Sequence, residues 1–295
     1  MADASMGHQS RLSMAAAGTA IGSYTEAYEF RTEGLRAARE IVETSGIRGT
    51  RSMPIERTRD GTVRINGTIA FHATPAMLDL LLPRIMGSAE VADLFAVAET
   101  LPEFDVLIER VAKRFVYAGC KVARATFRAT AGGALELDLE ITGKSETVSA
   151  TAFPTIAAPT DPPYIWSDAV CTVEGSARVV TRWELSIDNQ LNARFSNSNT
   201  ATDIHTQGRV VTVSMTVPYT SDEVDLYNIN SSGASGATFV LTNGGRSITF
   251  TIGALAVADS SPVVGGPGEI LLEMNGIAKS SGSTKELSIT SDSTA

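Results

Sequence analysis

The stretches GGALELDLEITG, residues 132–143, and GGPGEILLEMNG, residues 265–276, decide how this chain is interpreted. Aligned without a gap, at an offset of 133 residues, they share six identities in twelve positions. The identical pairs are Gly132/Gly265, Gly133/Gly266, Glu136/Glu269, Leu139/Leu272, Glu140/Glu273 and Gly143/Gly276. Apolar residues alternate with others in each stretch, which is the pattern of a half-buried β-strand. We therefore expect the same strand to occur twice.

Other elements repeat in the same order. The stretches TVRINGTIAF (62–71) and VVTVSMTV (210–217) alternate with period two and align at an offset of 146 residues. Each is followed by a helix start, with Thr74 and Thr220 as expected N-caps and Pro75 at the first helical position. The order of strand, capped short helix, strand meander and final GG-strand indicates an internal duplication.

The fold class expected from these patterns is mainly β, with two tandem β-sandwich or barrel-like domains and a short helix flanking each. A further short helix is expected over residues 33–43. Four prolines in AFPTIAAPTDPP predict a stiff linker. The expected divisions are a flexible N-terminal arm (1–30), a first domain (31–151), the linker (152–163), a second domain (164–280) and a polar C-terminal tail (281–295).

Composition limits the function classes. The chain of 295 residues has a formal net charge of −9, and its second half is more acidic than its first. This balance argues against a site that grips phosphates by charge. Its two cysteines form neither a disulfide framework nor a CxxC pair, and we expect reduced core thiols. No apolar run is long enough to span a membrane.

The search for chemistry is mostly negative. The three histidines have no second His or Cys at metal-ligand spacing, and no nucleophile elbow, HExxH or phosphate-loop motif occurs. We expect no catalytic residue, metal or cofactor. Glu136, Asp138 and Glu140 share one strand face, a spacing that suits a hydrolase acid pair or a calcium site. Their repeat counterparts are Glu269, Leu271 and Glu273, which weakens both ideas.

Two further segments suit contacts between subunits. The first is an arginine cluster interleaved with acidic residues, for which inter-subunit ion pairing is more plausible than nucleic-acid binding; its candidates are Arg48, Arg51, Arg57 and Arg59. The second is the long polar loop 190–208, interpreted as an arm reaching a neighbouring subunit. Its candidate residues are Asn192, Arg194, Asn197, Asp203 and His205.

Several stretches resemble the major tail tube proteins of tailed bacteriophages. They are GIRGTRS, TPAMLDLLLPRIMG, AETLPEFDVLIERV and YAGCKVARATF in the first half, and ELSIDNQLN and GRVVTVSMTV in the second. The resemblance spans roughly residues 44–279 and rests on a family-level pattern rather than on a chemical signature.

The resemblance implies a non-enzymatic virion protein that assembles with copies of itself. Six tube domains close a ring around an inner β-barrel, and rings stack into a hollow tail through which double-stranded DNA passes. Two fused domains imply a ring of three chains. The implied partners are tape-measure, tail-terminator and baseplate or distal tail proteins, with assembly in the host bacterial cytoplasm.

A negative bore would let DNA slide. From alternation and sign, the candidates for its wall are Glu136, Asp138, Glu140, Glu269 and Glu273. The basic strand with Lys121, Arg124 and Arg128 would weaken this idea if it faced the same way. The main alternative function is a two-domain β-sandwich binding or adhesin module, for example one for carbohydrate. That module would need a cluster of exposed aromatic residues.

Overall fold

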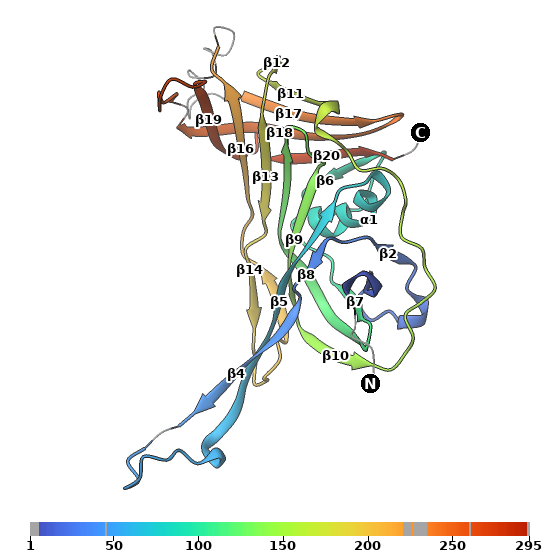
Figure 1. Ribbon diagram of the computed structural model, residues 1–295, viewed down its shortest axis with the longest axis vertical. Coiled ribbons are helices and arrows are strands. Elements are labelled where there is room, and N and C mark those ends of the chain that lie inside the picture. The colour runs from blue at the N-terminus through green and yellow to red at the C-terminus, as the bar shows by residue number, and fades with distance from the viewer. Residues whose placement is uncertain (1–5, 45, 221–225, 227–234, 260, 294–295) are drawn as a thin grey trace.

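The computed structural model describes residues 6–44, 46–220, 226, 235–259 and 261–293, and strands dominate it (Figure 1). The expected mainly β fold is confirmed. The first half contains β1 (Arg11–Ala16), β2 (Glu26–Tyr28), β3 (Thr32–Glu33), β4 (Arg36–Glu43), β5 (Thr58–His72), β6 (Leu94–Ala96), β7 (Phe104–Arg110), β8 (Lys113–Thr130), β9 (Glu136–Gly143) and β10 (Ser145–Ser149). The second half contains β11 (Ala169–Val173), β12 (Ser176–Arg178), β13 (Arg182–Asp188), β14 (Leu191–Arg194), β15 (Asp203–Thr206), β16 (Val210–Pro218), β17 (Ser235–Asn243), β18 (Arg246–Asp259), β19 (Leu271–Lys279) and β20 (Leu287–Asp292). The helix α1 spans Pro75–Met86.

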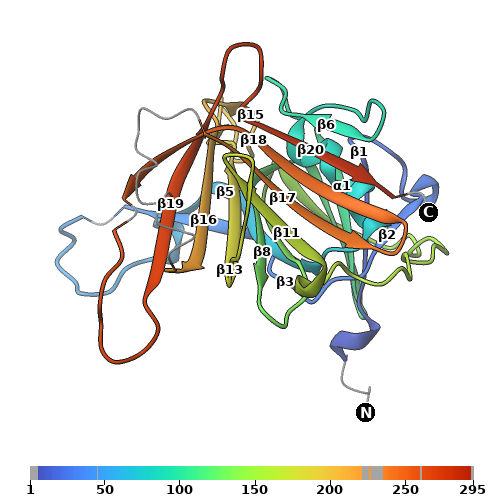
Figure 2. The same cartoon turned by 90° about the horizontal axis from the view of Figure 1, so that it is seen from above.

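Seven strands form one antiparallel sheet that crosses both halves of the chain, which we call the central sheet (Figures 1 and 2). Its order is β4, β5, β9, β8, β13, β16 and β19. The halves meet where β8 pairs with β13 over seven residue pairs, from Arg124–Asp188 to Thr130–Arg182.

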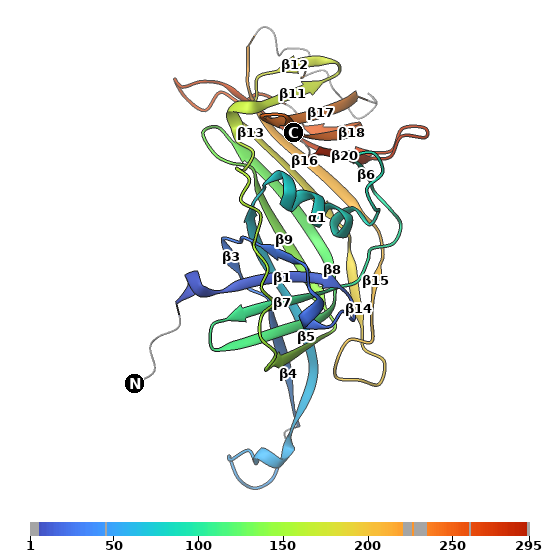
Figure 3. The same ribbon diagram turned by 90° about the vertical axis from the view of Figure 1, so that its right-hand side faces the viewer.

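Shorter strands and α1 cover one face of the central sheet (Figure 3). The first part of β8 pairs with β7 and β10, and β7 pairs with β1. In the second half, β18 pairs with β17 and β20. The helix α1 contacts β8, β6, β18 and β20, so it fills the space between these layers.

Side chains from both halves enter one hydrophobic core cluster. At its centre Trp183 of β13 stacks on Phe239 of β17, with ring centroids 4.1 Å apart. Phe250 of β18 lies 5.0 Å from the Trp183 ring and also 5.0 Å from Phe127 of β8. Buried aromatic pairs of this kind add about 0.5–1.5 kcal/mol each beyond the area they bury. The core therefore reinforces the strand pairing between the halves.

The two matching stretches end on glycines that the packing requires. A Cβ at Gly143 would lie 2.9 Å from the Cys120 sulfur, and one at Gly276 would lie 2.6 Å from a Leu255 methyl carbon. Neither position has room for a side chain. The first stretch forms β9, as expected, but the second becomes a strand only from Leu271. Residues 265–270 have no strand partner.

The predicted helix at Thr74 and Pro75 is confirmed as α1, but its cap differs from the expectation. The Thr74 hydroxyl has no hydrogen-bond partner, whereas Asp161 accepts a 3.0 Å hydrogen bond from the Ala76 backbone N–H. The helix also continues past Pro83 and ends at Gly87, which adopts the left-handed conformation. The second helix start, expected after Thr220, lies outside the described residues.

Three expectations are wrong. Residues 33–43 are not helical: β4 pairs with β5, and this pairing overrides the helix propensity of an Ala-, Arg- and Glu-rich stretch. The N-terminal arm is not free, because β1 pairs with β7 and β2 and buries Leu12 and Met14. The C-terminal tail contains β20, whose Leu287 and Ile289 are buried.

The Pro-rich segment 152–163 has no strand or helix, as its prolines predict, but it packs along the body. Phe153 is buried, and Asp161 caps α1. Asn243 of the second half donates a 2.8 Å hydrogen bond to the Pro162 carbonyl. This segment therefore holds the helix and the second half in place.

The cap of α1 gives a test of this arrangement. We expect Asp161→Ala to lower the free energy of unfolding by about 1 kcal/mol, because it leaves a buried helix N-terminus without its acceptor. Thr74→Val removes only an unused hydroxyl and should change stability by less than about 0.5 kcal/mol. Urea denaturation of both variants measures the difference, and equal effects would assign the cap to Thr74 after all.

Candidate functional site

The central sheet has one face that is not covered by other elements of the chain. In β19 every second residue is buried, and the residues between them are exposed. The strand registers align these exposed positions with polar residues of β16, β13, β8, β9 and β5. We call this surface the polar face. Its members include Asn66, Thr68, Arg124, Arg128, Glu136, Asp138, Glu140, Arg182, Glu184, Asp188, Thr212, Ser214, Thr216, Glu273 and Asn275.

Three of the acidic candidates, all on β9, lie on the polar face. The neighbouring strand β8 places Arg124 opposite Glu140 and Arg128 opposite Glu136. The two arginines thus share the face with the carboxylates, which is the arrangement that weakens the expectation of an acidic wall. In this half the carboxylates are largely compensated by arginine.

Each of the two arginines lies between two carboxylates from the strands on either side. Arg124 contacts Glu140 of β9 at 3.4 Å and Asp188 of β13 at 2.6 Å. Arg128 forms ion pairs with Asp138 of β9 and with Glu184 of β13. Arg182 adds a 2.8 Å contact to Glu184. We call this set of ion pairs across β9, β8 and β13 the arginine ladder.

The remaining acidic candidates differ in their surroundings. Glu136 pairs with Arg31, at the edge of the polar face. Glu269 and Glu273, in the second half, are exposed, and neither forms an ion pair within the described part of the chain. Lys121 is turned away from the ladder, with its ammonium 2.7 Å from the Ile204 carbonyl. The compensated charges therefore lie where the two halves join.

The two edges of the central sheet are exposed and apolar. At one edge β4 has a pairing partner only on its β5 side among the described strands, and Ile41 and Val42 on it are exposed. At the other edge, Leu271–Met274 of β19 pair with β16 alone. Beside them Val263 and Val264 are exposed, and Glu269 and Glu273 line a shallow pocket. Open strand edges of this kind are templates for pairing with another chain.

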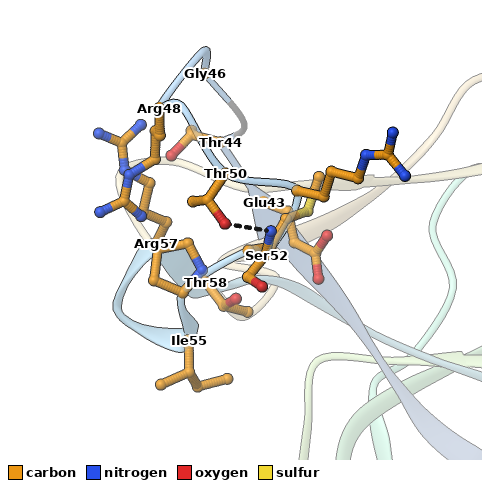
Figure 4. A pocket seen from close by; sticks show the side chains of 12 residues that line it. Glu43, Thr44, Gly46, Arg48, Thr50, Ser52, Ile55, Arg57 and Thr58 are labelled. Carbon is orange, nitrogen blue, oxygen red and sulfur yellow. Dashed lines mark hydrogen bonds between the residues drawn. The ribbon is translucent and has the colours of Figure 1, made fainter.

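The loop between β4 and β5, residues 44–57, extends beyond the body of the molecule (Figure 1). We call it the arm tip. Ile47, Met53 and Ile55 are exposed there, with Ile55 at 77 % of its accessible surface. Figure 4 shows Arg48 and Arg57 grouped on one side of the pocket in this loop, with Ile55 pointing away. Within the described residues, none of the four candidate arginines forms an ion pair; they are Arg48, Arg51, Arg57 and Arg59.

The long loop 190–208 is not an open loop, because β14 and β15 form a hairpin in it. The hairpin lies against β5 of its own chain, where the Asn199 carbonyl accepts a 2.6 Å hydrogen bond from the Val63 N–H. Arg64 also lies over the Phe195 ring, 5.2 Å from its centroid. Of the five candidates here, Asn192, Arg194, Asn197 and His205 are exposed, and Asp203 is half-buried, 3.3 Å from the His205 imidazole.

Other kinds of site find little support in the described residues. No group of three or more His, Cys, Asp or Glu side chains in that part of the chain is placed to hold a metal ion. Over the same residues no helix is long and apolar enough to cross a membrane. The large exposed hydrophobic side chains there include no aromatic residue, so the platform that a carbohydrate-binding module would need is missing. Burial raises the pKa of the Cys120 thiol, which leaves it protonated and unreactive.

The ladder makes stability depend on pH. Partial burial favours a higher pKa for Asp188, but hydrogen bonds from Arg124 and the Gln190 N–H hold that pKa below its usual range. The ionised carboxylate therefore stabilises the fold above its unfolded-state pKa of about 3.9. This contribution is lost as the pH falls through the lower folded-state value.

We expect Asp188→Asn to lower the free energy of unfolding at pH 7 by up to about 1 kcal/mol, since both partners are partly exposed. The difference from the wild type should shrink as the pH falls below about 4. Urea denaturation between pH 7 and pH 3 measures it. A difference that is unchanged over this range would contradict the assigned ion pair.

Comparison with known proteins agrees with the resemblance in the sequence. Residues 7–278 match a family described as phage tail tube protein. No curated protein matches the chain. The family is structural rather than enzymatic, its members assemble into a tube and associate with other tail components, and they belong to the virion tail. Since the match covers nearly the whole chain, the protein belongs to the phage tail tube protein family.

Proposed function

We propose that copies of this chain close into rings through the two edges of the central sheet, and that the rings stack into a tube that carries double-stranded DNA. The observation that supports this most is the pair of open, apolar edges at opposite ends of one sheet. An interface between two different edges repeats from copy to copy, and it closes into a ring if the rotation closes.

The junction inside the chain supplies a pattern for the junction between chains. The first half contributes β4, β5, β9 and β8 to a run of paired strands, and the second contributes β13, β16, β19 and β18 in the same relation. In this comparison β13 corresponds to β4. Because β13 pairs with β8 of the preceding half, we propose that β4 pairs with the second half of a neighbouring copy.

The strand registers support the internal duplication on which this pattern rests. Ile65 lies opposite Gly143, and Val213 lies opposite Gly276. An offset of 133 residues in the GG-strand thus goes with 148 in its partner, two residues more than the sequence alignment favours. A shift of two residues keeps every side chain on the same face of the sheet.

The same comparison identifies the segment that would receive β4. At the 133-residue offset Asn275 corresponds to Thr142, and these residues pair with Asp259 and Lys121. The counterpart of Arg124–Thr130, which pairs with β13, is therefore residues 262–268, beyond the end of β18. This segment has no strand partner in its own chain. Its two prolines are compatible with an edge position.

The charges of the two edges are complementary. Arg36 and Arg39 are exposed on β4, and Glu269 and Glu273 are exposed at the other edge. Complementary charges favour pairing between unlike edges over pairing between like edges. With two repeats in each chain, a ring of three chains would contain six repeats, and it would be assembled in the host cytoplasm. Tape-measure, tail-terminator and baseplate or distal tail proteins would be its partners in the tail.

A charge exchange tests the ring interface. We expect Arg36→Glu with Arg39→Glu, or Glu269→Arg with Glu273→Arg, to raise the concentration needed for assembly by about tenfold, since like charges would face each other. The variant that carries all four changes should assemble nearly as well as the wild type. Sedimentation velocity with negative-stain electron microscopy measures assembly.

Glu90→Arg, on an exposed loop away from both edges, is the control for net charge. Failure of the fourfold variant to recover assembly, with its folding intact by circular dichroism, would refute the proposed edge pairing.

The arm tip is proposed as the contact between stacked rings, because its apolar residues and arginines have no partner surface in their own chain. We expect Ile47→Asp with Ile55→Asp to leave rings intact and to shorten or abolish tubes, since two charges would be placed in an apolar contact. Val179→Asp, at another exposed apolar residue, is the matched control. Electron microscopy counts rings and tubes, and normal tubes from the arm variant would exclude this role.

A further inference from the structure

We propose that the arginine ladder keeps its arginines from binding duplex DNA, so that the polar face does not adhere to the DNA that passes it. This inference rests on the proposed function, in which the polar face lines the bore. It differs from a simple acidic wall, because the carboxylates act on particular arginines rather than on the DNA alone.

The ladder joins strands with groups that would otherwise bind phosphate. Arginine forms bidentate contacts with phosphate as readily as with carboxylate. Arg124 and Arg128 are both more than a third exposed at the side chain, so phosphate groups could reach them. They are the two basic residues of β8 that cross-link β9 and β13. The sheet therefore uses them at a place where free arginines would hold DNA.

Geometry explains why these arginines are not available. Arg124 contacts one carboxylate on each side, Glu140 at 3.4 Å and Asp188 at 2.6 Å. Arg128 has the same arrangement, between Asp138 and Glu184. Each guanidinium is therefore shared by two negative charges, and the local sum around it is negative. A phosphate would have to displace a carboxylate while a second one remained beside it.

The second half shows what the face looks like without the ladder. Thr212, Ser214 and Thr216 of β16 are uncharged, and the β19 positions beside them are Glu273, Asn275 and Ile277. No arginine lies on these two strands, and Glu273 has no ion-pair partner within the described residues. Arginine and carboxylate thus occur together at the junction of the halves, and neither phosphate-binding group stands alone elsewhere on these strands.

Repetition makes a weak attraction important. A tube would present the same face in every copy, so even a small affinity per copy would be multiplied along the DNA. One additional phosphate contact changes the slope of log affinity against log salt by about 0.9 for duplex DNA. Occupying each arginine within the sheet removes this contact from every copy at once.

The test compares variants of equal charge in the full-length chain, kept below its assembly concentration. Glu140→Gln with Asp188→Asn removes both partners of Arg124. Glu269→Gln with Glu273→Gln removes the same number of charges but frees no arginine. Fluorescence anisotropy with a labelled duplex of random sequence, between about 20 and 200 mM salt, measures affinity and its salt dependence.

We expect the first variant to bind the duplex roughly tenfold more tightly than the wild type at low salt, with a steeper salt slope of about one phosphate contact. The charge-matched control should change affinity by less than about twofold, and adding Arg124→Gln to the first variant should reverse its gain. Equal binding by both variants, no gain in the first, or tight binding by the wild type would overturn the inference.

Two further measurements keep the outcome clear. Thermal unfolding checks that each variant is folded, and Asp138→Asn with Glu184→Gln repeats the test around Arg128 if the first variant is not. Electron microscopy of the wild type tests tube formation separately. A chain that assembles but fails the binding comparison would reject the ladder alone, and a chain that passes the comparison but forms no tube would reject the proposed function alone.

Discussion

The pairing of β8 with β13 is the constraint on which the rest of the structure depends. It joins the two halves into one sheet over seven residue pairs, and the aromatic cluster around Trp183 packs directly behind it. This pairing places the arginines of β8 beside the carboxylates of β13, and it leaves β4 and β19 as the outer edges of the sheet. The polar face, the ladder and the open edges are consequences of the same contact.

Local patterns in the sequence predicted the local elements well. Alternation located the strands that become β5, β9 and β16, and Thr74 with Pro75 located the start of α1. The failures occurred where a distant segment decides the structure. Residues 33–43 have good helix formers, but pairing with β5 makes them a strand. The N-terminal and C-terminal segments looked polar or small, and they became strands because β7 and β18 offered them partners.

The candidate site was predictable only in part, for the same reason. Alternation correctly placed Glu136, Asp138 and Glu140 on one strand face, but no local signal gives the register between β9, β8 and β13. That register pairs the carboxylates with Arg124 and Arg128 and turns an acidic strand into a compensated one. Likewise, Asp161 lies 85 residues from the N–H that it caps, so the sequence suggested Thr74 instead.

The central claim is that one sheet continues from chain to chain around a bore, and cryo-electron microscopy of assembled wild-type protein tests it most directly. The account predicts a ring with three-fold symmetry in which β4 of each copy lies beside residues 262–268 of the next, with the polar face turned inward. An assembly whose contacts leave both sheet edges in solvent, or whose polar face points outward, would contradict it.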